Sequence, residues 1–263
     1  MKGRNELLPT VGEIYKFIDG FAPFRTAMDF DNCGFQAGDA AAEVHTVLLA
    51  LDITPDVVLE ASHRNAQLII SHHPVIFNPL RSLKAATAPY MLAEYGIAAI
   101  CAHTNLDLAR GGVNTCLADR LCLTDVKALA VDKASGLPAA LAGKPAKKYR
   151  PSEFAGFVKK ALGCDGLFYT DGGKEISSVG LCSGAGSDYV DAAYSFGCQA
   201  FVTGEAKHHE MIHAENIGMT LIAAGHYYTE DVVIRPLAER LKKAFPSVEF
   251  LRAEFSHCPA RYL

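Results

Sequence analysis

Three short segments of the chain pair a histidine with a carboxylate or with a second histidine. Each segment directly follows an apolar run. Imidazoles combined with carboxylates, with no thiolate among them, form a donor set that suits Zn, Mn, Fe, Co or Ni. Adjacent histidines diverge from one backbone, so they suit two ions about 3.5 to 4 Å apart better than one shared ion. The segments are His72 with His73, His103 with Asp107, and His226 with Glu230.

A site for two ions needs a bridging carboxylate, and Glu230 is our candidate. Thr229 has the character of a helix cap, which would place Glu230 in the first turn of a helix that continues through residues 232 and 233. The positive end of the helix dipole stabilises a carboxylate at that place. We therefore expect Glu230 to be held rigidly.

The four-residue spacing of His103 and Asp107 lets both side chains point toward one pocket without both being ligands. The pair offers a carboxylate of ligand type in Asp107, and His103, if it stays uncoordinated, is our candidate for the catalytic residue that moves protons. Two other interpretations stay open. His103 can itself be a ligand, or it can only hydrogen-bond a neighbouring loop.

Two further groups of residues lie outside these segments. His208, His209 and His213 are interleaved with charged residues at helical spacing, which favours a solvated helix face near the site. The segment 184–187, Gly-Ala-Gly-Ser, follows an expected strand, and its N–H groups could bind an anion.

Apolar runs of strand length alternate with helical patterns, which predicts an α/β fold with mainly parallel strands. A capping box at Thr10 and Glu13 predicts a first helix that ends near Phe21. In an open parallel sheet ligands bind beyond the carboxyl ends of the strands, so the three segments should meet at one rim. We expect strands at 47–51, 68–71 and 97–102, and helices from Pro55, over 89–95 and over 112–123.

The chain contains an internal similarity at a shift of 132 positions. Residues 47–73 superpose on 179–205 without a gap and with six identities, among them Gln67 with Gln199. With one inserted residue, His103 and Asp107 align with His226 and Glu230. The similarity predicts two α/β halves related by duplication. We place one domain at 1–130 plus 232–263 and the other at 131–231, with 144–151 as a connection near a boundary.

Composition excludes several classes of protein. The chain has 25 Lys and Arg against 29 Asp and Glu, a net charge of -4, so the electrostatic footprint of nucleic-acid binding is missing. No apolar run reaches the 18 residues of a membrane span. The eight cysteines form no CxxC pair, which favours reduced, mostly buried thiols and a cytoplasmic protein.

Six motifs in order give the chain a family resemblance. Together they resemble the dinuclear metal centre family, which includes homologues of type 2 GTP cyclohydrolase I, YbgI-like proteins and Ngg-interacting-factor-like proteins. Phe30 stands where this family usually has Trp. The motifs are DFDNCGFQAG at 29–38, SHHP at 71–74, HTNLD at 103–107, CSGAGS at 182–187, TGE at 203–205 and AGHYYTE at 224–230.

The resemblance implies two α/β domains that face each other across a metal-binding cleft, in a toroidal homohexamer. It implies that His103 lines the same pocket as the metal ligands. The implied ligands of two divalent transition-metal ions, of unknown identity among Zn, Fe, Mn, Co and Ni, are His72, His73, Asp107, His226 and Glu230.

Two divalent ions with two ligating carboxylates leave a net charge of about +2, which favours an anionic small-molecule substrate. We expect a dinuclear-metal-dependent hydrolase that acts on a nucleotide-like or phosphorylated small molecule, as the resemblance to GTP cyclohydrolase homologues suggests. The alternative is a non-catalytic metal-binding regulatory or scaffold protein assembled as a ring. In the second half, Glu205 stands at the position that His73 has in the first. Different residues at equivalent positions favour an enzyme over a symmetric structural metal site.

Overall fold

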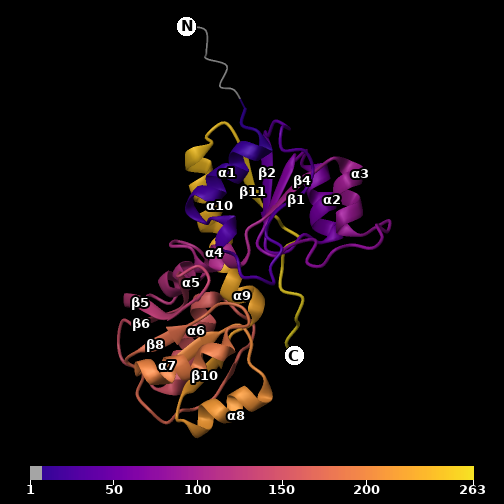
Figure 1. Ribbon diagram of the computed structural model, residues 1–263. Coiled ribbons are helices and arrows are strands. Elements are labelled where there is room, and N and C mark those ends of the chain that lie inside the picture. Colours follow the sequence, from indigo (N-terminus) through magenta and orange to yellow (C-terminus); the bar gives the residue numbers. More distant parts are fainter. Residues whose placement is uncertain (1–7) are drawn as a thin grey trace. The chain divides into compact units, whose positions relative to one another are not determined.

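The computed structural model describes residues 8–263, which fold as two compact units. The first unit runs to Leu106 and resumes at Ile234–His257, and the second consists of Asp107–Val233 and Cys258–Leu263. Each unit has its own β-sheet with helices, so the predicted α/β class is confirmed (Figure 1). The chain first passes from one unit to the other after Leu106, which is earlier than the domain limit at residue 130 expected from the sequence. The expected domain limits stay a prediction.

The first unit is built on a five-stranded sheet in the order β1-β4-β3-β2-β11. Only the β1–β4 pair is antiparallel. Helix α4 carries the chain from the first unit into the second. The elements are α1 (Val11–Phe21), η1 (Phe24–Thr26), β1 (Gly34–Ala37), β2 (Thr46–Ala50), α2 (Pro55–His63), β3 (Leu68–Ser71), α3 (Ala88–Tyr95), β4 (Ala98–Cys101), α4 (Thr104–Leu108), α10 (Ile234–Ala244) and β11 (Glu249–Arg252).

Helices cover both faces of the first sheet. Figure 1 shows α1 and α10 on one face and α2 and α3 on the other. Every residue of β2, β3 and β4 is buried, as continuous apolar strands of a parallel sheet must be. The predicted caps are present, because the Thr10 hydroxyl accepts from the Glu13 N–H and Pro55 occupies the first turn of α2.

The second unit has a six-stranded mixed sheet in the order β5-β6-β8-β9-β10-β7. Only β8, β9 and β10 pair in parallel, so the expectation of mainly parallel pairing holds for the first unit and is wrong for the second. The elements are α5 (Val113–Arg120), β5 (Thr124–Val131), β6 (Pro138–Lys144), α6 (Pro151–Leu162), β7 (Phe168–Tyr169), β8 (Val179–Leu181), η2 (Ser187–Tyr189), α7 (Val190–Phe196), β9 (Ala200–Thr203), α8 (His208–Asn216), β10 (Thr220–Ala223), α9 (His226–Glu230) and η3 (Asp231–Val233).

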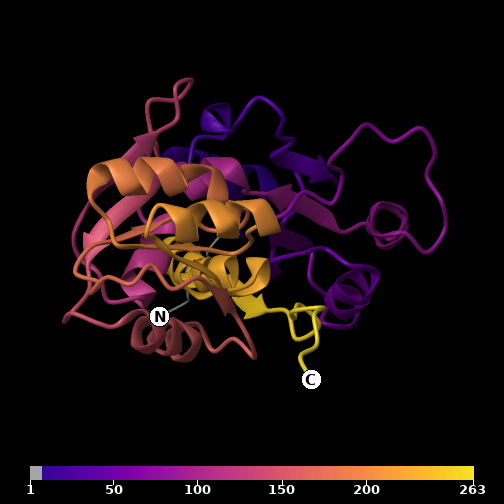
Figure 2. The ribbon, with the colours of Figure 1, turned by 90° about the horizontal axis from the view of Figure 1, so that it is seen from below.

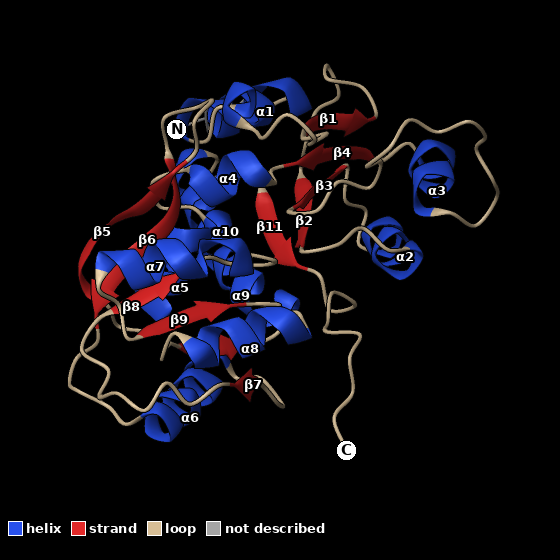
Figure 3. Cartoon of the chain, turned by 60° about the horizontal axis from the view of Figure 1, so that its bottom comes forward, coloured by secondary structure: helices blue, strands red, loops and turns tan. Residues whose placement is uncertain are grey.

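Two apolar clusters fix the layers of the second unit. Leu117 of α5 and Phe154 of α6 pack against Leu181 and Val202 on one face of the sheet. The other cluster includes Val190 of α7 and Ala214 of α8, which pack with Phe201. Figure 3 shows α7 and α8 beside the strands of this sheet. The segment 144–151 lies between β6 and α6 inside this unit, and no unit boundary falls there.

The internal similarity extends to side-chain hydrogen bonds. Gln67 Oε1 accepts from the N–H groups of residues 45 and 46, and its amide donates to the carbonyl of Asn65. Gln199 Oε1 accepts from the N–H groups of residues 177 and 178, and its amide donates to the carbonyl of Gly197. All three partners are shifted by the same 132 positions, which supports the proposal of a duplication.

The structure tests two expectations drawn from the composition, one on the cysteines and one on membrane spans. All eight cysteines are free thiols; three are buried, four are half-buried and Cys122 is exposed, so the expectation that most are buried is wrong. Among residues 8–263, no helix combines the length and the apolar character that crossing a membrane requires.

Candidate metal centre

The first unit brings three histidines together at the end of its sheet. Strands β3 and β4 run parallel and in register, with Ser71 opposite Cys101. His72 and His73 follow β3, and His103 follows β4 two residues after Cys101. The ligand atoms of the three imidazoles lie within 4.8 Å of one another. A carboxyl-terminal strand end thus gathers donors, as predicted for a parallel sheet.

Acceptors fix how His72 and His73 are oriented. His72 Nδ1 lies 2.9 Å from the carbonyl oxygen of Ala102, and His73 Nδ1 lies 2.7 Å from Asp52 Oδ1. Carbonyl and carboxylate oxygens only accept, so both Nδ1 atoms carry a proton. In the neutral ring, Nε2 then holds the lone pair that can bind a metal. Histidines that bind metals usually donate their other ring N–H to a carboxylate or carbonyl oxygen in this way.

His103 is held in the same way by Asp31. Its Nδ1 lies 2.8 Å from Asp31 Oδ1, and the N–H and hydroxyl of Thr104 donate to Asp31 Oδ2. The side chain of Asp31 is fully buried. Burial alone would raise the pKa of Asp31, but the hydrogen bonds from His103 and Thr104 outweigh it and lower that pKa. Asp31 is therefore an ionised anchor for this imidazole.

The second unit holds a histidine and a carboxylate one helical turn apart. Helix α9 begins after Gly225, and His226 and Glu230 occupy its first and last positions. His226 Nδ1 lies 2.9 Å from Glu205 Oε1, and His226 Nε2 lies 3.0 Å from Glu230 Oε2. Two atoms this close can both bind one ion, since ligand bonds to nitrogen and oxygen are about 2.0 to 2.2 Å. The donor set therefore fits a divalent transition metal.

Gly184 lets the loop after β8 pack directly on Glu230. A Cβ atom at residue 184 would overlap Glu230 Oε1, and the backbone there has a φ of +59°. The N–H of Gly184 donates to the Thr229 hydroxyl at 3.1 Å, and that of Gly186 donates to Thr203 at 2.9 Å. These two N–H groups already have partners within the protein, so they are not the groups of this segment that could bind an anion.

Thr229 does not cap a helix, contrary to the prediction. It lies inside α9, which ends at Glu230 and is followed by η3. Glu230 is therefore positioned by the turn it shares with His226 and by the Gly184 loop, and not by a helix dipole.

Asp107 lies in α4 and belongs to the second unit. Its backbone carbonyl accepts from Asn114, whose side-chain oxygen in turn accepts from the N–H of Ser183. Burial raises the pKa of the Cys182 thiol, and the carboxylates of Asp107 and Glu230 raise it further. The two predicted carboxylate ligands thus act on the same thiol.

The three predicted segments follow strands of two different sheets. His72, His73 and His103 follow strands of the first sheet, whereas His226 follows β10 of the second. That all three segments meet at one rim stays a prediction. The assignment of all six residues to one centre stays a proposal.

His208, His209 and His213 lie on α8 with exposed side chains, so the predicted solvated helix face is confirmed. His213 pairs with Asp191 at 2.6 Å. Over residues 8–263, no three-ligand cluster includes any of these three histidines.

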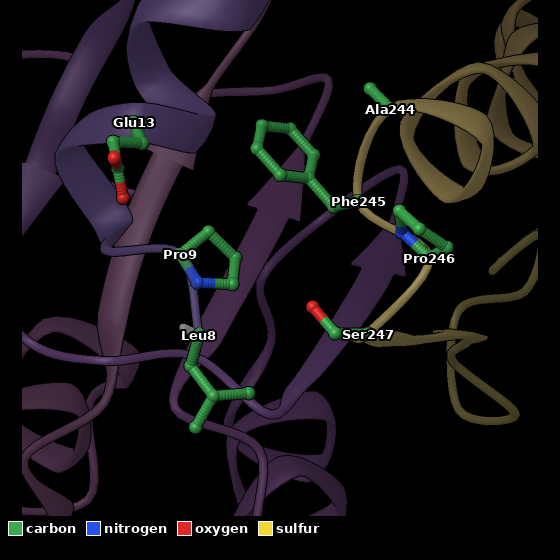
Figure 4. A pocket seen from close by; sticks show the side chains of 7 residues that line it. All are labelled: Leu8, Pro9, Glu13, Ala244, Phe245, Pro246 and Ser247. Atoms are coloured by element: carbon green, nitrogen blue, oxygen red, sulfur yellow. The ribbon is translucent and has the colours of Figure 1, made fainter. Parts of the chain in front are cut away.

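A cavity of about 410 Å³ lies elsewhere in the first unit (Figure 4). Pro9 and Glu13 line it from the start of the chain, and Phe245 and Pro246 line it from the turn after α10. The Glu13 carboxylate is engaged with Thr10 in the capping box. None of the histidines proposed for the metal centre lines this cavity.

The sequence analysis missed the acceptors behind the histidines. Asp52 was given no role, Asp31 was named only within a motif, and Glu205 was named within a motif and as the counterpart of His73. Each of them lies 2.7 to 2.9 Å from a histidine Nδ1. A carboxylate two residues after a buried strand was the available signal for Asp52.

Comparison with known proteins agrees with the motifs. The pattern of one family matches residues 9–259, nearly the whole chain. The chain belongs to the Duf34/NIF3 (NGG1p interacting factor 3) family. The family resemblance inferred from the sequence motifs is thereby confirmed.

Several bacterial relatives of this NIF3-family chain carry an enzyme's name. A Clostridium perfringens protein named GTP cyclohydrolase 1 type 2 homolog is 28% identical over 262 residues, with 96% of this chain and 99% of the relative aligned. A Campylobacter jejuni protein of the same name is 30% identical, with 88% and 92% aligned. A Helicobacter pylori protein named GTP cyclohydrolase 1 type 2 is 30% identical, with 84% and 86% aligned.

Solved structures share the fold. A Bacillus cereus protein related to NIF3 superposes with a TM-score of 0.90 at 22% identity, over 97% of this chain and 100% of that one. Reduced HcgD from Methanocaldococcus jannaschii superposes with a TM-score of 0.81 at 26% identity, over 94% and 98%. The NIF3 fold of this chain is thus established.

Proposed function

We propose that the chain is a dinuclear-metal-dependent hydrolase for a nucleotide-like or phosphorylated small molecule. Two divalent transition-metal ions would be held by imidazole and carboxylate side chains. When bound, the ions would act as Lewis acids that activate water and polarise the group under attack. The proposed ligands are His72, His73, Asp107, His226 and Glu230.

The observation that carries the proposal is the common orientation of the imidazoles. In every one of these histidines, Nδ1 donates to an oxygen that can only accept, and Nε2 is presented as a ligand. If these histidines served only to stabilise the fold, they would not all need to donate through the same ring nitrogen. The hydrogen bonds are those of His72 to Ala102, His73 to Asp52, His103 to Asp31 and His226 to Glu205.

His103 would move the proton of the reaction at its Nε2 atom. The ionised Asp31 keeps the Nδ1 proton in place and stabilises the positive ring that forms when Nε2 takes up a second proton. The side chain of His103 is 15% exposed, so it remains open to a substrate. His103 also lies within 4.8 Å of His72 and His73, which keeps the role of a third ligand as its alternative.

The charge of the site favours an anionic substrate. Two divalent ions and two ligating carboxylates leave a net charge of about +2, which a phosphate group would offset. The names of the bacterial relatives point to a nucleotide. We further propose that the chain works as a homo-oligomer, a toroidal hexamer by family resemblance.

The proposal is tested by product analysis. Protein reconstituted with Zn, Mn, Fe, Co or Ni is incubated with a panel of nucleotides and phosphate esters, and the products are separated by chromatography. We expect hydrolysis of a nucleotide that depends on the metal and is lost on removal by a chelator. Full metal occupancy without turnover of any compound would instead favour a non-catalytic regulatory or scaffold protein.

A further inference from the structure

Two exposed aromatic rings lie on the loops that carry the histidine cluster. Phe30 is 62% exposed and Phe77 is 46% exposed. Their ring centres are 6.5 Å apart and their planes are inclined by 42°, so the rings touch without stacking face to face. Contact with each other leaves much of both rings exposed to solvent.

The backbone beside Phe30 is fixed to the histidine cluster. Asp31 follows Phe30 directly, and its carboxylate accepts from His103 Nδ1 and from the N–H and hydroxyl of Thr104. The N–H of Met28, two residues before Phe30, donates to the same Thr104 hydroxyl at 2.9 Å. Phe30 is thus held one residue away from the anchor of a site histidine.

The backbone beside Phe77 is fixed to the same loop. The amide of Asn32 donates to the carbonyl of Ile76 at 2.6 Å, and the N–H of Ile76 donates to Gln36 Oε1 at 3.1 Å. Phe77 follows Ile76 directly and stands four residues after His73. The two rings are therefore held together by their loops as well as by their own contact.

The segment that continues from Phe77 carries positive charge. Residues 77–87 are all exposed, and the only charged side chains among them are Arg81 and Lys84. Figure 2 shows this segment, between β3 and α3, as a wide arc beside α3. Arg81 and Lys84 follow Phe77 by four and seven residues, and their charges complement the phosphate of a ligand that also carries a planar ring.

We propose that Phe30 and Phe77 bind the planar base of a nucleoside phosphate, and that Arg81 and Lys84 face its phosphate. Aromatic side chains bind bases by stacking, which every base permits because each has a π-face. The pair would hold the base beside the histidines, so it would select a nucleotide over a sugar phosphate. This inference rests on the proposed function for the identity of the site, and it names the part of the substrate that the site recognises.

The test measures binding of guanosine, GMP and inorganic phosphate to zinc-loaded protein by calorimetry. F30A and F77A should each weaken the binding of guanosine and GMP by about 5- to 150-fold and leave phosphate binding unchanged. The double variant R81Q/K84Q should weaken GMP and not guanosine. F168A, which removes a ring 67% exposed in the second unit, should change none of these affinities.

A second measurement detects the bound base directly and does not depend on a loss of affinity. The chain contains no tryptophan, so F30W introduces a single tryptophan at the proposed stacking position, and excitation at long wavelength selects it over the tyrosines. GMP and guanosine should quench it, whereas inorganic phosphate should not.

The outcomes separate this inference from the proposed hydrolase. GMP affinities of F30A and F77A equal to that of the unmutated protein, or no GMP binding at millimolar concentration, would overturn the inference. If F30A or F77A changes the mass measured by light scattering and leaves GMP binding unchanged, the pair is a contact between copies of the chain. That result would also overturn the inference. Base binding that depends on both rings, without turnover of any nucleotide, would support the inference and contradict the hydrolase.

Discussion

At the scale of single residues, the candidate centre depends on which atom each side chain offers. His103 and the two histidines after β3 offer Nε2 because acceptors hold their Nδ1 atoms. Glu230 offers a carboxylate because a glycine loop packs against it and His226 lies one turn before it. Exchanging single residues therefore separates ligands from residues that move protons or position others.

His103→Asn should leave the metal content and the folded state unchanged and lower the turnover of any accepted nucleotide by about 10² to 10⁴-fold, the usual contribution of a general acid or base. Asp107→Asn should lose metal and activity together, because it removes an anionic ligand. Metal content and turnover are measured on the same batch of each variant. If His103→Asn loses metal as fully as Asp107→Asn, His103 is a ligand and the assignment as a proton carrier is wrong.

Gly184→Ala should reduce metal retention, because the new Cβ displaces the Glu230 carboxylate. It should also cost about 1 to 2 kcal/mol of unfolding free energy, since the backbone is left-handed there. Gly173→Ala is the matched control, with a φ of +68° and open space around the site of its Cβ. Equal metal retention in the two variants, measured by competition with a chelator, would show that Gly184 does not position Glu230.

At the scale of elements, the sequence predicted what local patterns determine. Capping boxes, prolines and buried apolar runs placed α1, α2, β3 and α3 to within a residue or two. It did not predict the β5–β6 hairpin, because most of β5 is exposed and lacks an alternating apolar pattern. Nor could it give the order of the strands within each sheet, because strand order is decided by long-range packing. The three-histidine cluster was predictable, because its residues follow two neighbouring apolar strands.

Gln67→Ala and Gln199→Ala should each lower the free energy of unfolding by about 1 to 2 kcal/mol, because each leaves two backbone N–H groups without their acceptor. The losses should add in the double variant, since the residues lie in different units. Urea denaturation measures the free energy of unfolding of the two single variants and of the double variant. A loss at one glutamine only would contradict the structural equivalence of the two halves.

At the scale of the whole molecule, the proposed hexamer predicts the mass in solution. Light scattering should give about six times the 28.2 kDa of the chain. Closed rings are common among homo-oligomers because every subunit then uses the same surfaces. A single species at 28.2 kDa and micromolar concentration would exclude the ring and leave the metal centre unaffected.

The central claim is that the anchored imidazoles and the carboxylates hold metal, and elemental analysis tests it most directly. After reconstitution with each of Zn, Mn, Fe, Co and Ni, the protein should retain close to two ions per chain with at least one of them. His73→Ala and Glu230→Ala should lower that number sharply, whereas His213→Ala, which removes an exposed histidine paired with Asp191, should not. No retained metal in the unmutated protein with any of the five ions would contradict the account.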